Sequence, residues 1–199
     1  MCPLFETIRI ESGLPKHPFW HECRMNRARL EIWKKKSPVS LSETIQVPDG
    51  YSTGLVRCNI YYGPEIREIV FKKYEKRIIR SLKLVNGGNI DYHQKYSDRS
   101  ILESLFAQRG DCDEILIVKN GLITDTSVSN IIFKSGNLWV APANPLLPGT
   151  CRERLLKEGK IVERRVRPVD LALYQGYKLI NALRYPEEMT IQPVSSISW

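Results

Sequence analysis

The chain has 199 residues and a mass of 23.0 kDa, enough to bury a hydrophobic core in one large or two small domains. Its 42% hydrophobic and 26% charged residues are ordinary for a globular protein, and its apolar runs are too short to span a bilayer. The net charge is +8, but the basic residues are not accompanied by a nucleic-acid-binding motif. A basic surface that attracts a small anionic substrate explains the charge equally well. We therefore expect no nucleic-acid partner and no membrane partner.

The cysteines and histidines do not form a metal-binding pattern. No C-x-x-C pair is present, and the histidines are too scattered to form a ligand cluster. We expect reduced thiols rather than disulfides or a zinc site. The first residues lack the basic and apolar regions of a secretory signal, so we expect a cytoplasmic location. The five cysteines are Cys2, Cys23, Cys58, Cys112 and Cys151, and the histidines are His17, His21 and His93.

Apolar periodicity predicts a mixed α/β chain with antiparallel hairpins in two lobes. Residues 66–85 fit a helix by their charges and strands by their alternation, and we favour strands. The turn-prone segment Asn86-Gly87-Gly88-Asn89 predicts a linker, which divides a small N-terminal α/β lobe (1–87) from a larger C-terminal lobe (88–199). Further predicted strands cover residues 5–10, 55–61, 114–119, 122–126, 130–134, 137–140, 162–166 and 178–183. Predicted helices cover residues 20–36, 150–157 and 169–174, and a further helix between a cap at Ser97-Asp98 and Gly110.

Two residues stand out as candidates for covalent or acid–base chemistry. Lys95 precedes the capped helix, and a lysine amine becomes nucleophilic when burial or nearby cations keep it neutral. Asp125 follows the strand of an apolar hairpin, where a buried acid needs a partner such as a pyridinium nitrogen. A solvated lysine and an acid at a strand edge are the structural alternatives. These residues alone do not decide between the two interpretations.

Two further features could bind phosphate. Gly149-Thr150-Cys151 opens a predicted helix, and the N–H groups at a helix start bind anions through their geometry and dipole. Arg24, on the first predicted helix, could make a bidentate contact to a phosphate. Many ordinary helices begin with a similar turn, and many helical arginines lie on the surface.

Six segments stand in an order that carries more information than any one of them. They are Phe5-Glu6-Thr7-Ile8-Arg9, His21-x-x-Arg24-Met25, Lys95-x-x-Asp98-Arg99, Asp125 with Asn130-x-x-Phe133, Leu147-Pro148-Gly149-Thr150-Cys151-Arg152 and Ile180-Asn181-Ala182-Leu183. In this order the chain resembles the enzymes of fold type IV that depend on pyridoxal phosphate (PLP). They form the class IV aminotransferase family, which includes branched-chain and D-amino acid aminotransferases and 4-amino-4-deoxychorismate lyases.

The resemblance implies a two-lobed, D-amino acid aminotransferase-like fold of the mixed α/β class, with a shortened N-terminal lobe. It implies that Lys95 is the catalytic Schiff-base lysine of the C-terminal lobe and that Asp125 holds the ring nitrogen protonated. Asp125 stands where the family has a glutamate, and Cys151 stands where it has a threonine, so that the hydroxyl contact can move to Thr150. The residues implied to bind PLP are Arg24, Lys95, Asp125, Gly149, Thr150, Cys151 and Asn181.

Among the family's activities, the segment Asn181-Ala182-Leu183 is most similar to the aminodeoxychorismate lyases. The resemblance then implies a homodimer that converts 4-amino-4-deoxychorismate to 4-aminobenzoate and pyruvate in folate biosynthesis, with Lys95 also moving the proton. An aminotransferase acting on branched-chain or D-amino acids is the first alternative, and a degenerate PLP-binding protein without catalysis is the second. Candidate residues for the substrate are Thr7, Arg27, Arg57 and Arg184.

Overall fold

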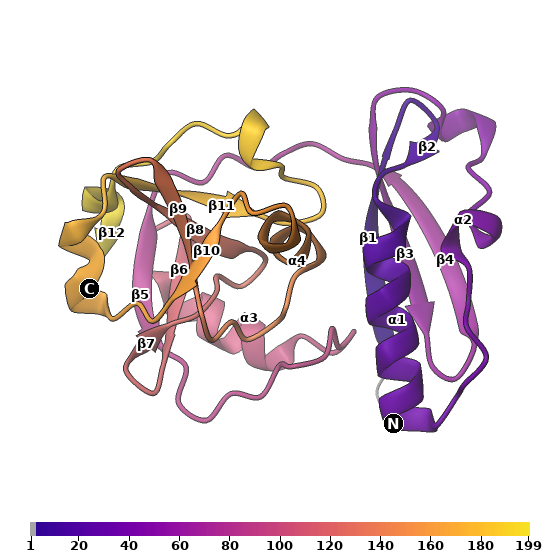
Figure 1. Cartoon of the computed structure of the whole chain (residues 1–199), viewed down its shortest axis with the longest axis horizontal. Helices are drawn as coiled ribbons and strands as arrows, with labels where there is room; N and C mark the ends of the chain where they lie inside the picture. Colours follow the sequence, from indigo (N-terminus) through magenta and orange to yellow (C-terminus); the bar gives the residue numbers. More distant parts are fainter. Residues whose placement is uncertain (1–2) are drawn as a thin grey trace. The chain divides into compact units, whose positions relative to one another are not determined.

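The computed structural model describes residues 3–199, so Cys2 and its expected reduced thiol lie outside the described residues. The chain forms two compact units (Figure 1). The first unit consists of the chain up to Lys76 together with the short segment Gln94–Asp98. The second unit consists of Arg77–His93 and Arg99–Trp199.

The first unit is an antiparallel sheet with a helix packed on one face. The strand order is β2-β1-β3-β4, and Figure 1 shows helix α1 lying along this sheet. Even-numbered side chains of β1, such as Leu4 and Ile8, share a core with Met25 and Ala28 of the helix, because successive side chains of a strand point to opposite faces. The elements are β1 (Leu4–Glu11), β2 (Leu14–Pro15), α1 (Pro18–Trp33), α2 (Leu41–Thr44), η1 (Asp49–Tyr51), β3 (Leu55–Tyr62) and β4 (Ile66–Lys73).

Local backbone chemistry sets both ends of helix α1. Pro18 occupies its first turn, where a missing N–H costs no hydrogen bond. Lys34 adopts a left-handed conformation with φ of 57°, and its N–H donates to the carbonyls of Arg29 and Leu30. The helix therefore begins two residues before the start of the predicted range 20–36 and ends three residues before its end.

The second unit is built on two sheets that share a core. Their strand orders are β12-β5-β6-β7 and β10-β9-β8-β11. Leu82 and Leu116 of the first sheet pack in one cluster with Phe133, Tyr177 and Leu179 of the second. The strands are β5 (Leu82–Asn86), β6 (Glu114–Lys119), β7 (Leu122–Ile123), β8 (Asn130–Ser135), β9 (Leu138–Pro142), β10 (Val162–Arg164), β11 (Gly176–Ile180) and β12 (Ile197–Ser198).

The α-helices of the second unit are short. Helix α4 buries Cys151 and Leu155 in a cluster with Ile132 of β8 and Ile180 of β11, which anchors the start of the helix to the sheet. The predicted helix 169–174 is a 3-10 helix that begins at Pro168. The helices are α3 (Ser100–Phe106), η2 (Ala107–Arg109), α4 (Thr150–Lys157), η3 (Pro168–Leu173), η4 (Pro186–Glu188) and η5 (Val194–Ser196).

The mixed α/β prediction is confirmed, and residues 66–85 form β4 and β5, as the favoured interpretation expected. The division between the lobes differs from the predicted boundary after Gly87. Strand β5 pairs in parallel with β6, so it belongs to the second unit, and Gly87 donates its N–H to the carbonyl of Val118 within that unit. The predicted linker is therefore a turn, and the segment that carries Lys95 belongs to the first unit rather than to the C-terminal lobe.

The predicted cap at Ser97-Asp98 is also corrected. Helix α3 begins at Ser100, and its N-cap residue Arg99 makes no side-chain capping bond. Ser97 instead donates its backbone N–H and its hydroxyl to the carbonyl of Pro3, at 2.9 and 2.7 Å. These bonds tie the Lys95 segment to the start of the first unit, a long-range contact that local sequence does not reveal.

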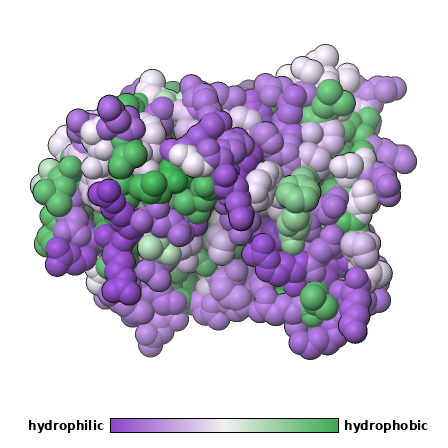
Figure 2. All heavy atoms as spheres, in the orientation of Figure 1, coloured by the Kyte–Doolittle hydropathy of each residue, from purple (hydrophilic) through white to green (hydrophobic). Residues whose placement is uncertain are grey.

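The surface is largely polar. Figure 2 shows a mostly hydrophilic face on which hydrophobic residues form small separate groups, as expected for a chain with 26% charged residues. Within residues 3–199, no helix combines the length and hydrophobicity that a membrane span requires.

Candidate functional site

Lys95 is held against the first strand of the sheet. The N–H of Phe5 in β1 donates to the Lys95 carbonyl at 3.0 Å, and the Nζ atom of Lys95 lies 4.4 Å from the centre of the Phe5 ring. The Phe5 ring in turn stacks on Tyr61 of β3, with 5.8 Å between ring centres. The lysine amine therefore lies over an aromatic face at a defined place instead of extending freely into water.

The face of the sheet that carries Phe5 is polar beyond this ring. Thr7 of β1 lies on the same face two residues further along, directly opposite Asn59 of β3. Asn59 is buried, and among the contacts of residues 3–199 its Oδ1 atom has no hydrogen-bond donor. Arg57 lies next on this face, opposite Arg9. Two of the predicted substrate residues, Thr7 and Arg57, thus share the face that carries Phe5, whereas Arg27 is exposed on α1.

On the opposite face of β1, Glu6, His21 and Arg24 form a buried cluster. Arg24 donates from Nε to Oε1 of Glu6 at 2.8 Å and from Nη2 to Oε2 at 2.6 Å. The Nδ1 atom of His21 lies 2.7 Å from the same Oε2. Helix α1 supplies both His21 and Arg24, because residues three apart lie on one face of a helix. Arg24 therefore makes a bidentate contact to Glu6 within the protein, and its predicted contact to a phosphate stays a prediction.

The charges in this cluster follow from its geometry. Burial by itself would raise the pKa of Glu6, but the charge of Arg24 and hydrogen bonds from His21 and Arg24 outweigh it and bring the pKa to about 2. Burial lowers the pKa of His21, which favours the neutral ring. A carboxylate only accepts hydrogen bonds, so the proton of the neutral imidazole is on Nδ1.

Asp125 is buried between β7 and β8, and its two oxygens have different donors. Asn130 donates from Nδ2 to Oδ1 at 2.7 Å, and the backbone N–H of Leu147 donates to Oδ2 at 2.9 Å. Burial raises the pKa of Asp125 to about 6, against the opposing effect of these donors. These hydrogen-bond donors are neutral, and the charge of Arg152 and the backbone of Leu146 also act against the rise in pKa. Each carboxylate oxygen can accept a second hydrogen bond, so the acid is suited to a further, cationic partner.

Asn130 joins this acid to the turn that precedes α4. Its Nδ2 also donates to the carbonyl of Leu147 at 3.0 Å. A Cβ atom at Gly149 would lie 2.1 Å from Oδ1 of Asn130, so this position requires a glycine for close approach. Asp125, Asn130 and Gly149, which belong to two of the six sequence segments, therefore form one hydrogen-bonded and packed arrangement.

The start of α4 carries one buried hydroxyl and one buried thiol. Thr150 begins the helix, and the next residue, Cys151, packs in the core against Leu155. Burial raises the pKa of the Cys151 thiol to about 11, so the side chain behaves as a small apolar group. Thr150 supplies the hydroxyl at the start of this helix, and its contact to a phosphate stays a prediction.

Asn181 forms hydrogen bonds with the loop between Asp125 and Asn130. Its Nδ2 donates to the carbonyl of Val128 at 3.2 Å and to Oγ of Ser129 at 3.0 Å, and its Oδ1 accepts from the N–H of Leu183 at 2.8 Å. The structure thus brings Asn181 next to the residues that follow Asp125, within the second unit. Sequence inspection alone did not indicate these contacts.

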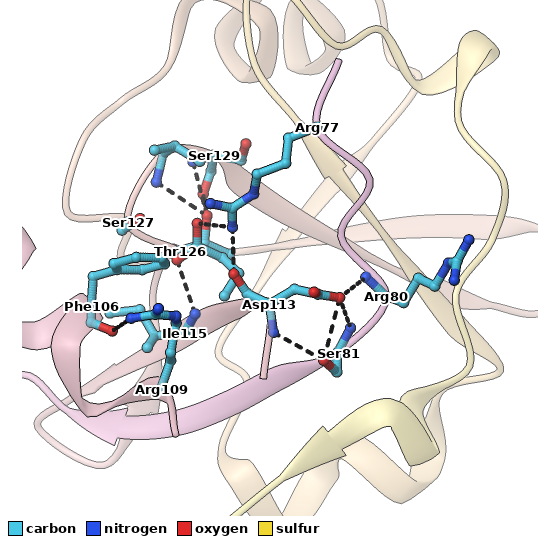
Figure 3. A network of polar contacts seen from close by, with 12 residues as sticks. Arg77, Arg80, Ser81, Phe106, Arg109, Asp113, Ile115, Thr126, Ser127 and Ser129 are labelled. Atoms are coloured by element: carbon cyan, nitrogen blue, oxygen red, sulfur yellow. Dashed lines mark hydrogen bonds and ion pairs between the residues drawn. The ribbon is translucent and has the colours of Figure 1, made fainter. Parts of the chain in front are cut away.

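Arg184, a predicted substrate residue, is buried and contacts a polar network. Its Nη2 donates to the carbonyl of Arg77, whose guanidinium in turn donates to the carbonyl of Asp113. Figure 3 shows Asp113 between Arg77 and the segment Arg80-Ser81, whose N–H groups donate to the Asp113 carboxylate at 2.7 and 3.2 Å. These contacts stabilise the start of β5, and they give Arg184 a structural role in the second unit.

Comparisons with known proteins agree with this arrangement. The sequence profile of the amino-transferase class IV family matches residues 72–197. This chain belongs to the class IV aminotransferase family. Members of this family are PLP-dependent enzymes, so the chain is an enzyme of that type and has the fold type IV architecture.

Three similar proteins show how far the likeness extends. An uncharacterized protein of Haemophilus influenzae is 43% identical over 185 residues, which are 92% of this chain and 98% of that protein. A crystal structure from Haemophilus somnus, of a protein provisionally named a 4-amino-4-deoxychorismate lyase, is 37% identical with a TM-score of 0.85, and the match covers 93% of this chain and 98% of that one. A hypothetical aminotransferase from Mycobacterium tuberculosis, in a PLP-bound form, shares the fold at 15% identity and a TM-score of 0.78, over 98% of this chain and 81% of that one.

The class IV aminotransferase chain offers groups that fit PLP. The fit rests on a lysine amine held over an aromatic ring, a buried acid whose hydrogen-bond donors are neutral, and a glycine turn that opens helix α4. The sequence analysis did not predict the buried cluster that Glu6 and His21 form with Arg24. An acid in the otherwise apolar series Leu4, Ile8 and Ile10 was the available signal.

Proposed function

We propose that this enzyme is a PLP-dependent lyase that converts 4-amino-4-deoxychorismate to 4-aminobenzoate and pyruvate. The observation that carries the proposed use of PLP is the buried Asp125, whose hydrogen-bond donors are neutral and whose pKa burial raises to about 6, so that it suits a cationic ring nitrogen as a partner. The choice of the lyase is supported by the Asn181-Ala182-Leu183 segment and by the name of the H. somnus protein at 37% identity. The reaction matches the folate-biosynthesis step expected above.

PLP would be bound by residues that the sequence predicted for it. Lys95 would attach the cofactor, Arg24 and the turn Gly149-Thr150 would bind its phosphate, and Asp125 would hold its ring nitrogen protonated. Asn181 and the backbone of Cys151 would support the loop and the turn around it. Bound PLP supplies an electron sink for the electron pair that remains when a C–H bond of the substrate is broken.

Lys95 would also perform the proton transfer. With its amine free, Lys95 would act as the general base that takes the proton from the ring carbon next to the substrate's amine. The electron pair of the broken C–H bond would then expel the enolpyruvyl group by breaking its C–O bond to the ring, which becomes aromatic, and the released enolpyruvate would take up a proton to give pyruvate. Asp125, as a carboxylate beside the ring nitrogen, would stabilise positive charge there throughout the step.

The substrate would contact the polar face of the first sheet. Thr7 and Asn59 lie beyond the Phe5 ring on this face, and Asn59 offers a buried oxygen that can accept a hydrogen bond. Arg57 could attract the carboxylates of a small anionic substrate. We further propose a homodimer that works in the cytoplasm without a nucleic-acid or membrane partner.

A class IV aminotransferase acting on branched-chain or D-amino acids is the alternative, supported by the family profile that matches residues 72–197. Both reactions use the same cofactor-binding residues, so these residues do not distinguish them. Formation of 4-aminobenzoate and pyruvate supports the lyase. Conversion of an amino donor with 2-oxoglutarate instead supports the aminotransferase, and PLP binding without either activity indicates a degenerate member.

The cofactor assignment is tested by adding PLP to the purified protein and recording its visible absorption, followed by borohydride reduction and mass-spectrometric mapping of the modified lysine. We expect the label on Lys95, and we expect Lys95→Ala to lose the absorption band and to lower activity by about 10²- to 10⁴-fold. Lys72→Ala, which replaces an exposed lysine on β4, is the matched control. We expect it to keep both the absorption band and the activity. A label on another lysine, or an unchanged spectrum in Lys95→Ala, contradicts the assignment.

A further inference from the structure

Glu6 interrupts an apolar pattern at a place where burial is complete. Residues 4, 8 and 10 of β1 are apolar and pack against α1, and Glu6 lies on this same face with no exposed surface. Binary patterning would place an aliphatic residue here. Local rules of this kind are broken mainly at functional or strained positions.

Stability alone does not account for the acid. Taking Glu6 and Arg24 out of water costs desolvation energy, and well-packed apolar residues of similar volume are often as stabilising as a buried ion pair. What an apolar residue cannot do is orient a guanidinium. The structural feature to be explained is therefore the geometry of the pair.

The pair restrains Arg24 in both plane and direction. Two parallel hydrogen bonds of 2.8 and 2.6 Å hold the Nε–Nη2 edge of its planar guanidinium against the Glu6 carboxylate. The Nη1 group consequently points away from Glu6, in the plane that the carboxylate sets. His21 donates to Oε2 at 2.7 Å and so restrains the carboxylate itself.

We propose that Glu6 is a positioning residue, which holds the guanidinium of Arg24 in the orientation that binds the phosphate of PLP. The inference rests on the proposed function, in which Arg24 is a phosphate ligand. His21 acts indirectly. Its Nδ1–H holds the Glu6 carboxylate in place, and that carboxylate orients the guanidinium of Arg24. Glu6 acts through Arg24 and has no direct role in the proton transfer.

The test compares PLP with pyridoxal, which lacks the phosphate. The ratio of their dissociation constants, measured by visible absorption, reports how much the phosphate contributes to binding. Glu6→Asp keeps the negative charge but shortens the side chain by one C–C bond of about 1.5 Å, which breaks the bidentate geometry. We expect this variant to reduce the advantage of PLP over pyridoxal by roughly tenfold or more while pyridoxal binds as before.

Glu11→Asp is the matched control, because Glu11 lies on the same strand and pairs with Arg9 at 3.0 Å with its side chain 44% exposed. It should leave the ratio unchanged. If Glu6→Asp weakens PLP and pyridoxal equally, or changes neither, the positioning role is wrong. If wild-type protein gives no absorption band with PLP, the proposed function fails, which is a different result.

A second pair of variants applies if Glu6→Asp does not fold. The amide of His21→Asn can still donate a hydrogen bond to Oε2 of Glu6, whereas His21→Leu cannot. We expect the PLP-to-pyridoxal advantage to be kept in His21→Asn and reduced in His21→Leu. Equal ratios in these two variants would contradict the proposal.

Discussion

Each of the two units of this enzyme buries a carboxyl group whose pKa is strongly shifted, and the two shifts are in opposite directions. Glu6 in the first unit has a pKa lowered to about 2, although burial alone would raise it. Asp125 in the second unit has a pKa that burial raises to about 6. The two groups are buried to a similar degree, so burial does not explain the difference.

The difference lies in the charge of their hydrogen-bond donors. Glu6 accepts two bonds from the cationic Arg24, whereas Asp125 accepts from the amide of Asn130 and from a backbone N–H. The buried thiols support this explanation, because burial raises the pKa of Cys58 in the first unit to about 12 and that of Cys151 in the second to about 11. Burial thus acts in the same direction in both units, and only the cationic partner reverses it.

This contrast matters for the proposed chemistry. Glu6 is already neutralised by Arg24, so it can orient that arginine. Asp125 has no cation among its hydrogen-bond donors, and the charge of Arg152 does not overcome the effect of burial, so a protonated ring nitrogen would be a cationic hydrogen-bond partner for it. The following predictions test the contrast, from the largest expected effect to the smallest.

Removing the carboxylate from the first cluster should destabilise the protein strongly. Glu6→Ala leaves Arg24 buried without its partner, and we expect a loss of about 3–5 kcal/mol in the free energy of unfolding, measured with urea at pH 7. Glu11→Ala, whose ion pair with Arg9 is partly exposed, should change it by less than about 1 kcal/mol.

The sign of the pH dependence gives a second check on Glu6. Its folded pKa lies below its ordinary value of 4.5, so its contribution is present above pH 4.5 and is lost as the pH falls towards 2. Glu6→Gln should flatten this part of the stability curve. An equally steep acid limb in Glu6→Gln would show that Arg24 does not hold the Glu6 charge.

The turn before α4 should be sensitive to a single methyl group. A Cβ at Gly149 would lie 2.1 Å from Oδ1 of Asn130, so Gly149→Ala must displace the residue that donates to Asp125. We expect a loss of about 1–3 kcal/mol, together with weaker PLP binding. Gly50→Ala, where a new Cβ meets no atom within 4 Å, is the control, and equal effects in the two variants would contradict the packing argument.

Asp125 should make the protein without PLP more stable in mild acid. Its folded pKa of about 6 lies above its ordinary value of 3.8, so the folded state binds the proton more tightly and stability rises as the pH falls through 6. Between pH 7.5 and 5 we expect a gain of about 1–2 kcal/mol, which should be absent in Asp125→Asn. Saturating PLP should also reduce this gain if the ring nitrogen becomes the partner of Asp125. The same slope in wild type and Asp125→Asn would exclude the assigned pKa.

The thiols give the smallest effect. Burial raises the pKa of Cys58 and Cys151, so both should react with iodoacetamide at pH 8 about a hundredfold more slowly than the half-buried Cys23 and Cys112. Mass spectrometry of each cysteine-containing peptide measures the four rates. Fast labelling of Cys58 or Cys151 in the folded protein would show that burial does not act alike in the two units.

Local pattern was enough to predict much of the second unit. Glu114–Lys119 and Thr150–Lys157 lie where their sequence periodicity placed them, and Asn120-Gly121 turns the chain with positive φ at both residues. Alternation also supported the strands within 66–85. These features depend on neighbours a few residues apart, which a sequence displays directly.

Other features depend on contacts between distant residues. The division of the chain was misplaced because the parallel pairing of β5 with β6 is non-local, and the turn at Gly87 resembles a linker when read alone. The cap at Ser97 was misassigned for the same reason, since its hydroxyl bonds to Pro3.

The sequence by itself determined the family of this enzyme and the order of its candidate residues, because those motifs are local and stand in register along the chain. Only the tertiary structure decided the directions in which the pKa values of Glu6 and Asp125 shift. Glu6 lies within β1 and Asp125 lies just after β7, and both are acids beside apolar residues, so nothing nearby in sequence distinguishes their pKa values. Their pKa values depend on which donors reach them across 18 residues for Arg24 and 22 for Leu147, and these partners are set by how the chain folds.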